Sequence, residues 1–287
     1  MQAAFVAASL LFTGVIANAQ VYIKPPIMQA NWSYPYEPFR IVGNLYYVGT
    51  YDLACYLITT PKGHILINTG LADATPMIIQ HIESLGFKVK DIKILLATHG
   101  HYDHVAGMAE LKKLTGAKIL INKRDAAVLA DGGNSDYVFG GKGMTFPPVK
   151  PDGLLDNNDV VKLGDMKITC IPTPGHTPGA TSFLFDVKDE KRTYKVLIAN
   201  MPTVLDDANL VTGMPLYPDV AKDYATTFET MRKLQFDIFL ASHAAQFNMH
   251  QKHKPGDAYN PDVFIDRKGY DAALDNFYRL YQRKLKQ

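Results

Sequence analysis

The sequence has little net charge and no long hydrophobic run. Its formal charge is +2 at pH 7, without a block of like charge or a low-complexity tract, so nothing indicates a nucleic-acid or anionic-membrane partner. The apolar run near its N-terminus, residues 5–12, is too short to predict a membrane span. With 287 residues, 47% hydrophobic and 20% charged, the chain has the composition of an ordinary soluble globular protein.

Cysteine is also scarce. Only Cys55 and Cys170 occur, and each lies in a segment rich in β-branched residues that predicts a strand. An exported protein could join them in a disulfide if their Cα atoms come close enough. We favour two free, buried thiols, which is the ordinary state of cysteine in a core strand.

Residues 1–19 lack charged side chains altogether. They end in Ala17-Asn18-Ala19, a pattern typical of a cleavage site, directly before Gln20. A basic segment at the start is missing, yet the pattern favours a cleaved export signal over a buried helix. We therefore expect residues 1–19 to be a signal peptide cleaved after Ala19, residues 20–287 to form the mature domain, and the protein to reside in the periplasm.

Strand-like and helix-like patterns alternate through both halves of the chain. In the first half they predict strands at residues 45–48, 54–59, 64–68, 92–97 and 118–121, and helices at residues 72–85, 104–114 and 125–129. In the second half they predict strands at residues 160–163, 166–171, 182–187, 194–198 and 237–241, and helices at residues 222–234 and 270–285. Residues 20–40, rich in proline and aromatic side chains, predict an extended arm. Because no linker divides the chain, we expect an α/β protein with a two-sheet core and helices outside.

A glycine-rich loop is predicted at residues 131–148. Aromatic and apolar side chains such as Tyr137, Phe139 and Phe146 interleave with its glycines. Such a loop could flank a substrate cleft, or its aromatic residues could simply fix it to the surface. Both interpretations stay open.

The most informative segment is His99-Gly100-His101-Tyr102-Asp103-His104, which directly follows the apolar strand at residues 92–97. Imidazole and carboxylate are ligands that zinc-class metals prefer. Side chains two apart in extended backbone point the same way, so His99 and His101 can bind one ion. Asp103 and His104 lie just beyond, where a helix is predicted to begin, and would face a second position. One short loop could therefore supply ligands to two metals.

Two further histidines follow predicted strands. His176 comes after Pro172-Thr173-Pro174-Gly175, and His243 comes after the strand at residues 237–241. Polar residues at the C-terminal ends of apolar strands are where α/β sites are usually assembled. Together with the four-ligand loop they make two sets of three candidate ligands, and catalytic zinc typically has three protein ligands and one open position.

Each added histidine also has a structural explanation. His176 alone could be a turn residue beside Pro178, and His243 alone could be a hydrogen-bonded core residue. The loop is harder to explain in that way, because burying three imidazoles and a carboxylate together without a metal is costly. The remaining histidines lack ligand spacing, and we interpret them as structural or surface residues: His64, His81, His250 and His253.

The order His99-x-His101-x-Asp103-His104, then Gly175-His176, then Ser242-His243 resembles the metallo-β-lactamase superfamily. That resemblance implies an αββα sandwich of two mixed β-sheets flanked by helices, with metals at one edge of the paired sheets. The chain is most similar to subclass B3, in which no cysteine binds zinc, since Met201 stands near the cysteine position of the other subclasses. Residues 37–41, 43–54 and 197–202 resemble the GOB-type branch.

The resemblance implies a residue-by-residue assignment of the site. The first zinc would be held by His99, His101 and His176, and the second by Asp103, His104 and His243. GOB-type members can carry glutamine at the first position, whereas this chain has His99, so its first site should hold zinc more readily. Asp103 would also orient the nucleophile. Thr203 falls where the subclass often has a serine that contacts the substrate carboxylate or an ordered water.

We therefore expect zinc-dependent hydrolysis of the β-lactam amide bond, and hence antibiotic resistance, with two Zn²⁺ per chain and a metal-bound hydroxide as nucleophile. No Ser-x-x-Lys motif is present to form a covalent acyl-enzyme. The expected partner is a small-molecule β-lactam, with no nucleic acid or membrane, and the expected state is a monomer.

Two alternatives stay open. A lactonase or a glyoxalase-II-like thioesterase of the same superfamily typically bridges its metals with an aspartate, where this chain has Ala199-Asn200-Met201. A secreted zinc-binding protein with structural sites would need four protein ligands for each ion, so three ligands for each ion favour catalysis.

Overall fold

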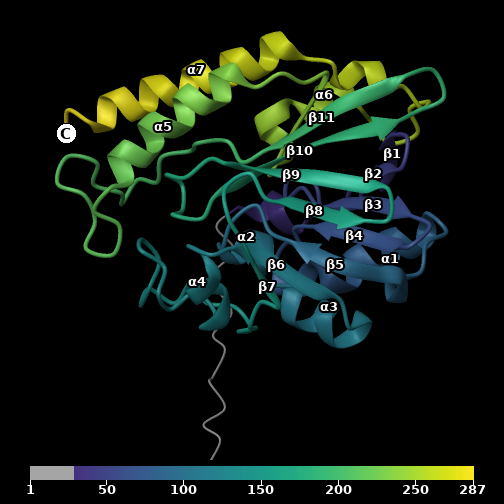
Figure 1. The fold of residues 1–287 in the computed structure, drawn as a ribbon, viewed down its shortest axis with the longest axis horizontal. Helices are drawn as coiled ribbons and strands as arrows, with labels where there is room; N and C mark the ends of the chain where they lie inside the picture. Colours follow the sequence, from purple (N-terminus) through teal and green to yellow (C-terminus); the bar gives the residue numbers. More distant parts are fainter. Residues whose placement is uncertain (1–28) are drawn as a thin grey trace, which may run out of the picture.

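Two mixed β-sheets pack face to face, with helices on their outer sides (Figure 1). This architecture is seen in a computed structural model, which describes residues 29–287. The expected αββα sandwich is confirmed. The predicted signal peptide, residues 1–19, and the first part of the predicted arm lie outside the described residues.

The first sheet has seven strands in the order β1-β2-β3-β4-β5-β6-β7. Strands β1 to β4 pair antiparallel and strands β4 to β7 pair parallel. The strands are β1 (Phe39–Val42), β2 (Leu45–Tyr47), β3 (Tyr56–Thr60), β4 (Gly63–Ile67), β5 (Ile92–Leu96), β6 (Lys118–Asn122) and β7 (Gly153–Leu155). A hairpin joins β3 to β4, with Thr60 opposite Gly63.

The second sheet has five strands in the order β12-β11-β10-β9-β8. Strands β8 to β11 pair antiparallel, and β12 pairs parallel to β11. The strands are β8 (Val160–Leu163), β9 (Met166–Pro172), β10 (Thr181–Lys188), β11 (Thr193–Ala199) and β12 (Ile238–Ala241). Strands β9, β11 and β12 therefore run in one direction and end at one edge of the sheet.

Helices cover the outer face of each sheet. Helices α1 (Thr75–Ser84) and α3 (Met108–Thr115) pack on the first sheet, whereas α5 (Val220–Lys233) and α7 (Arg267–Lys284) lie together over the second (Figure 1). The remaining short elements are α2 (Tyr102–Val105), α4 (Ala126–Ala130), α6 (Met249–Lys252), and the 3₁₀ turns at Ala30–Ser33, Ala72–Ala74, Val89–Asp91, Ala244–Phe247 and Pro261–Phe264. None of the described helices is long and apolar enough to cross a bilayer.

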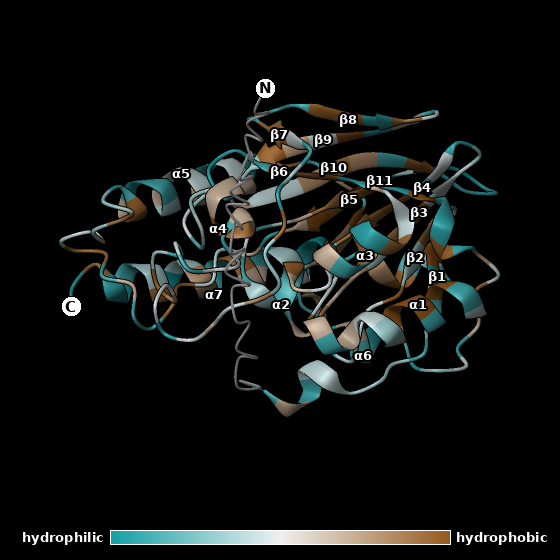
Figure 2. Cartoon of the chain, turned by 90° about the horizontal axis from the view of Figure 1, so that it is seen from below, coloured by the Kyte–Doolittle hydropathy of each residue, from teal (hydrophilic) through white to brown (hydrophobic). Residues whose placement is uncertain are grey.

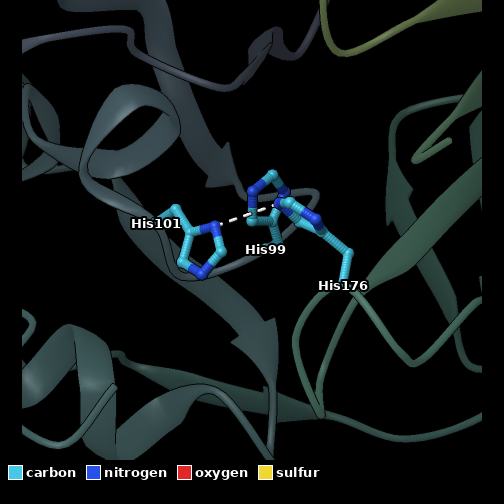
Figure 3. Close-up of side chains that lie close together, drawn as sticks. All are labelled: His99, His101 and His176. Carbon is cyan, nitrogen blue, oxygen red and sulfur yellow. Dashed lines mark hydrogen bonds between the residues drawn. The ribbon is translucent and has the colours of Figure 1, made fainter. Parts of the chain in front are cut away.

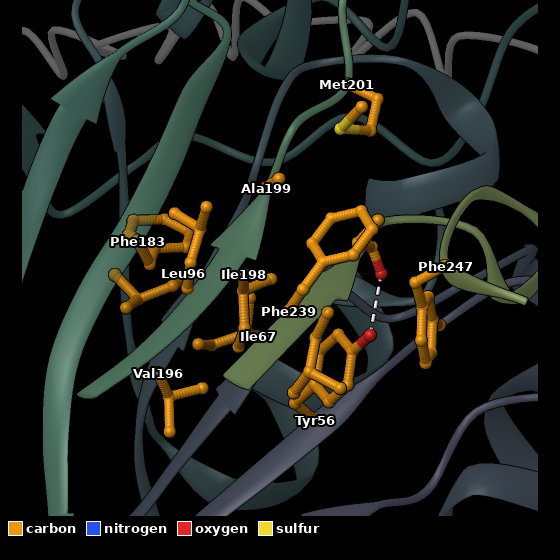
Figure 4. Close-up of a cluster of buried hydrophobic side chains, with 14 of the residues drawn as sticks. Tyr56, Ile67, Leu96, Phe183, Val196, Ile198, Ala199, Met201, Phe239 and Phe247 are labelled. Atoms are coloured by element: carbon orange, nitrogen blue, oxygen red, sulfur yellow. Dashed lines mark hydrogen bonds between the residues drawn. The ribbon is translucent and has the colours of Figure 1, made fainter. Parts of the chain in front are cut away.

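The main core fills the space between the two sheets and extends under α5 and α7. Phe183, Ile198 and Ile67 lie between the sheets in Figure 4, and each is fully buried. Strands are mainly brown in Figure 2, while α5 and α7 show much teal, as expected for helices with one solvent-facing side. Burying a phenylalanine or isoleucine side chain such as Phe183 or Ile198 stabilises the fold by about 1.5–3 kcal/mol.

A second core lies between the first sheet and α1 and α3. Cys55 belongs to this outer core, whereas Cys170 belongs to the core between the sheets. The two thiols thus lie in different layers, and the structure has both of them free and buried, as expected. Burial raises the pKa of Cys170 to about 12, so this thiol stays protonated and unreactive at neutral pH.

Three sequence predictions are corrected by the structure. The helix expected at residues 104–114 is two helices, α2 and α3, because Gly107 between them packs closely against Thr69 and Thr75: an added Cβ would lie 2.7 Å from the Thr75 hydroxyl. The arm expected at residues 20–40 includes a 3₁₀ turn and the start of strand β1. Strand β7 follows the glycine-rich loop and was not expected, because three residues show no periodicity.

Candidate metal centre

All six predicted ligands lie at one edge of the sandwich. His99 and His101 follow the C-terminal end of β5, and Asp103 and His104 lie on the short helix α2. His176 follows β9 and His243 follows β12, so the second sheet adds ligands from the ends of two of its strands. Strand β5 and strands β9 and β12 therefore end toward the same place, which is why residues far apart in sequence meet there.

Three histidines form the first group, which we call the three-histidine group: His99, His101 and His176. They are drawn in Figure 3, and their ligand atoms all lie within 4.8 Å of one another. His101 Nδ1 is 3.1 Å from His176 Nε2. Two nitrogens bound to one tetrahedral zinc, each at about 2.0–2.1 Å, lie roughly 3.3 Å apart, so this spacing suits zinc.

Hydrogen bonds orient the imidazoles of this group. His176 Nδ1 lies 2.9 Å from the carbonyl oxygen of Thr203, to which it donates, so its Nε2 remains a free acceptor. His101 Nε2 lies 3.1 Å from Asp136 Oδ2, which leaves Nδ1 directed at the other rings. Metal-binding histidines commonly donate their second ring N–H to a carbonyl or carboxylate in this way.

The tautomer of His99 follows from a buried chain of hydroxyl groups. Thr98 Oγ1 donates to Asn68 Oδ1 at 3.1 Å, so it must accept from its other neighbours. His99 Nδ1 lies 3.3 Å from Thr98 Oγ1 and is therefore the donor. This arrangement leaves the lone pair of His99 on Nε2.

The second group of predicted ligands, which we call the carboxylate group, is Asp103, His104 and His243. Asp103 Oδ2 lies 3.0 Å from His104 Nε2 and 3.5 Å from His243 Nε2. His99 also contributes to this region, since His99, Asp103 and His104 have ligand atoms within 4.8 Å of one another. His243 is held from behind, because its Nδ1 lies 3.0 Å from Asp52 Oδ2.

Burial and mutual repulsion keep part of this cluster in the form that binds metals. Burial and the charges of His104 and His176 hold the pKa of His99 well below its usual range, and burial and His101 lower that of His176 to about 3. Burial alone would raise the pKa of Asp103, but His104 and His243 outweigh it and hold that pKa well below its usual range. His99 and His176 are therefore neutral imidazoles, and Asp103 is an ionised carboxylate.

Two histidines differ, because each faces carboxylates. Burial alone would lower the pKa of His243, but hydrogen bonds with Asp103 and Asp52 raise it to about 9. Burial alone would also lower the pKa of His101, but the charge of Asp136 and its hydrogen bond outweigh burial and raise that pKa. Metal binding at these rings would therefore release protons.

An unpaired buried nitrogen shows that the cluster fits a metal. Among the described residues, His99 Nε2 is buried and has no hydrogen-bond partner. A buried polar atom without a partner costs about 1–3 kcal/mol. Such an atom, within 4.8 Å of further imidazole nitrogens and of an ionised carboxylate, is what a site for zinc-class metals requires.

A cavity of about 340 Å³ opens over the cluster. Four of the six predicted ligands line it, His101, Asp103, His176 and His243. The other lining residues are Gln29, Trp32, Asp52, Tyr102, Phe139, Thr203, Leu205, Ala245 and Gln246. Its wall thus combines aromatic side chains with candidate ligands, which suits a small molecule with a polar reacting group.

Thr203 and the glycine-rich loop both reach this cavity. The Thr203 hydroxyl lies 2.9 Å from His176 Nδ1, and the residue lines the cavity wall. From the loop, Phe139 lines the cavity, Asp136 contacts His101, and the Tyr137 hydroxyl donates to the carbonyl oxygen of His176. Of the two interpretations of residues 131–148, the structure therefore favours the loop that flanks a cleft.

Sequence reasoning missed the residues that support the ligands, above all Asp52 and Asp136. Asp136 belongs to no motif, and Asp52 was included only in segment 43–54 without a role of its own. Each reaches its histidine through a contact that is long-range in sequence. Trp32 was also missed as a cavity residue; its indole N–H donates to Asp52. The one available signal for Trp32 was its place in an aromatic segment that was expected to cover the domain.

The remaining histidines do not join this cluster. His81, His250 and His253 line a separate cavity of about 610 Å³ that shares no lining residue with the first. His81 Nδ1 donates to the carbonyl oxygen of Val48, and His250 Nε2 donates to that of Tyr51. These histidines are structural or surface residues, as expected.

Comparison with known proteins agrees with this geometry. Residues 49–191 match the family described as the metallo-β-lactamase superfamily. The chain is 60% identical to a β-lactamase from Chitinophaga pinensis, covering 92% of this chain and 100% of that one, with a TM-score of 0.90. It is 55% identical to the class B3 di-zinc metallo-β-lactamase LRA-12 from an Alaskan soil metagenome, covering 91% and 99%, with a TM-score of 0.88.

Two further relatives are less similar in sequence. GOB-18 from Elizabethkingia meningoseptica is 52% identical, covering 93% of this chain and 99% of that one, with a TM-score of 0.90. A hydroxyacylglutathione hydrolase from Bradyrhizobium sp. (strain ORS 278) is 32% identical over 131 residues, which is 46% of this chain and 42% of that protein. The chain spans about half the length of the curated relatives it matches. The chain belongs to the metallo-β-lactamase superfamily and, within it, to the class B3 metallo-β-lactamases.

Proposed function

We propose that the protein hydrolyses the amide bond of β-lactams with two zinc ions bound at this edge of the sandwich. The observation that carries the proposal is the three-histidine group beside the contacts of Asp103 with His104 and His243, next to a cavity open to a small molecule. Support also comes from relatives named as β-lactamases that match nearly their whole length at 52% to 60% identity.

The three-histidine group would hold one zinc, and the carboxylate group would hold the other. Each group supplies three protein ligands, which leaves a position open for water or substrate, whereas structural zinc sites use four. When bound, zinc supplies Lewis acidity and lowers the pKa of a bound water toward neutrality. The neutral imidazoles of His99 and His176 and the ionised carboxylate of Asp103 suit this role, and His101 and His243 would release protons on binding.

Side chains of the protein position the attacking water and the substrate. Asp103 presents an oxygen between His104 and His243, where it can orient the attacking water and accept its hydrogen bond. His176 and Thr203 lie side by side on the cavity wall, so the Thr203 hydroxyl is placed to contact the substrate carboxylate or a water beside it. Trp32 and Phe139 provide apolar surface for the substrate.

A thioesterase function is the second candidate, because curated relatives include hydroxyacylglutathione hydrolases. The segment that follows β11 speaks against it. This segment reads Asn200-Met201 and has no carboxylate to bridge two metals. Met201 is buried in the core between the sheets, so it offers no ligand in place of one.

A separate proposal concerns where the protein acts. We propose that they direct export and are removed after Ala19, so that the mature chain acts in the periplasm as a monomer. The export proposal is supported by the uncharged, apolar sequence of residues 1–19 and by its end, Ala17-Asn18-Ala19. N-terminal sequencing of protein from the periplasmic fraction tests this: a start at Gln20 is expected, and a retained Met1 would contradict it.

A substrate panel tests the reaction. Zinc-loaded protein should hydrolyse a chromogenic cephalosporin, lose that activity with a chelator and regain it with zinc. S-lactoylglutathione and a homoserine lactone serve as matched substrates for the two alternative hydrolases. Turnover of the thioester or the lactone without turnover of the cephalosporin would replace the proposed function, and no turnover of any of the three would favour a zinc-binding protein.

A further inference from the structure

A fully buried carboxylate lies next to the ligand loops and, within residues 29–287, forms no hydrogen bond or ion pair with a candidate ligand side chain. It is Asp125, which has no exposed surface and precedes helix α4. Aspartate at this position ordinarily accepts a hydrogen bond from its own helix, but Asp125 makes no such bond. Its two oxygens accept hydrogen bonds from other segments, and the N-terminus of α4 is left without this cap.

The carboxylate instead joins the two loops that carry the three-histidine group. Oδ2 accepts from the backbone N–H of Gly100 at 2.9 Å and from the hydroxyl of Thr177 at 2.6 Å. Oδ1 accepts from the backbone N–H of Gly179 at 2.6 Å. Gly100 lies between His99 and His101, and Thr177 directly follows His176, so each loop is held next to its ligands.

The two glycines show how closely the loops approach this residue. A Cβ added to Gly179 would lie 2.6 Å from Asp125 Cγ, and one added to Gly100 would lie 3.3 Å from Asp125 Cβ. Neither glycine has a positive φ, so close approach rather than backbone conformation explains both. The loops are therefore fitted around the carboxylate.

All three partners are donors, and this fixes the chemistry that the position needs. A carboxylate offers acceptors on both oxygens, whereas an amide would place an NH₂ group against a backbone N–H or a hydroxyl. Within residues 29–287, Asp125 forms no salt bridge, so these three hydrogen bonds are what compensates its burial. An aspartate on the surface would not require three protein donors, because water would satisfy its oxygens.

We propose that Asp125 is a positioning residue that holds the two ligand-bearing loops in register and thereby sets the zinc affinity of the three-histidine group. The inference rests on the zinc assignment of the proposed function. The effect should be local. Asp125 forms no hydrogen bond with Asp103, His104 or His243, so the zinc affinity of the carboxylate group should not depend on Asp125. This difference separates positioning from a general contribution to folding.

The test measures zinc affinity at one group at a time by chelator competition. His243→Ala leaves the three-histidine group, and His176→Ala leaves the carboxylate group. Adding Asp125→Asn should lower zinc affinity roughly tenfold in the first background, as for other residues that orient metal ligands, and less than twofold in the second. Asp223→Asn is the matched control, because it removes a nearby carboxylate that pairs with Arg124, and it should change neither affinity.

A second pair of variants keeps the test decisive if Asp125→Asn does not fold. Thr177→Val removes one donor to Asp125 while keeping its shape, and should cause a smaller loss of affinity in the His243→Ala background. Thr177→Ser keeps the hydroxyl and should restore it. Equal losses in both backgrounds, or none, would overturn the inference. If the His243→Ala protein binds no zinc at all, the zinc assignment itself has failed, and the inference falls with it.

Discussion

Replacing Asp52 tests whether the support behind the carboxylate group controls metal binding. Asp52 Oδ2 accepts from the indole N–H of Trp32 at 3.1 Å and lies 3.0 Å from His243 Nδ1. Its Oδ1 accepts from the backbone N–H of Ala245 at 3.0 Å. Asp52→Ala removes all three interactions, whereas Asp52→Asn can keep the two at Oδ2 through its amide oxygen and lose only the one to Ala245.

The size of the effect on folding follows from these contacts. Trp32 is buried, so its unpaired indole N–H should cost about 1–3 kcal/mol, and the half-exposed bond to Ala245 should add about 0.5–1.5 kcal/mol. Asp52→Ala should therefore lower the free energy of unfolding by about 2–4 kcal/mol, and Asp52→Asn by about 1 kcal/mol. Urea denaturation in the presence of a chelator measures this without a contribution from bound zinc.

The effect on zinc should be separate from the effect on folding. Without Asp52 the tautomer and orientation of His243 are no longer fixed, and loss of such a partner typically lowers metal affinity by about 10–100-fold. Chelator competition on folded Asp52→Ala protein should show this loss for one zinc of the two, with Asp52→Asn closer to the wild type. Wild-type affinity for both zinc ions in the alanine variant would refute the role given to Asp52.

Three further changes test other parts of the account. His99→Gln should leave the fold intact and weaken one zinc site most, which metal titration measures; unchanged affinity at both sites would mean that the ligand is wrongly assigned. Tyr56→Phe removes a buried 2.6 Å hydrogen bond from β3 to the carbonyl oxygen of Ala241 at the end of β12 (Figure 4). It should lower the free energy of unfolding by about 1–2 kcal/mol in urea denaturation, and no change would show that the bond is not needed. Thr203→Val should raise KM for the cephalosporin severalfold with little change in kcat; lost zinc in place of raised KM would assign Thr203 to the support of His176.

The parts of the molecule that could be predicted from sequence are those with local patterns. Strand β5 has a run of apolar residues and is followed by four candidate ligands within six positions, so both the strand and its metal loop are visible locally. The long helices α5 and α7 show the apolar spacing of helices that cover a sheet. The alternation of strands and helices predicted a two-sheet core, and the places of His176 and His243 after predicted strands made them candidate ligands. The resemblance added the αββα arrangement and the assignment of each histidine to one zinc.

The rest depends on contacts that no local pattern encodes. Asp52, Asp125 and Asp136 are single acidic residues among 28, and what distinguishes them is the partner that folding brings to each. Strands β1 and β7 lie at the edges of the first sheet, and with four and three residues they are too short for a period to show. The break between α2 and α3 comes from the close approach of Gly107 to a neighbouring loop, which is a tertiary effect.

The central claim is that two zinc ions at this edge of the sandwich perform β-lactam hydrolysis. The most direct measurement titrates metal-free protein with zinc while recording both zinc content and hydrolysis of a chromogenic cephalosporin. The account predicts no turnover without metal and activity that rises with zinc until about two ions are bound to each chain. Full turnover by zinc-free protein, or zinc binding at these residues without any hydrolysis, would contradict it.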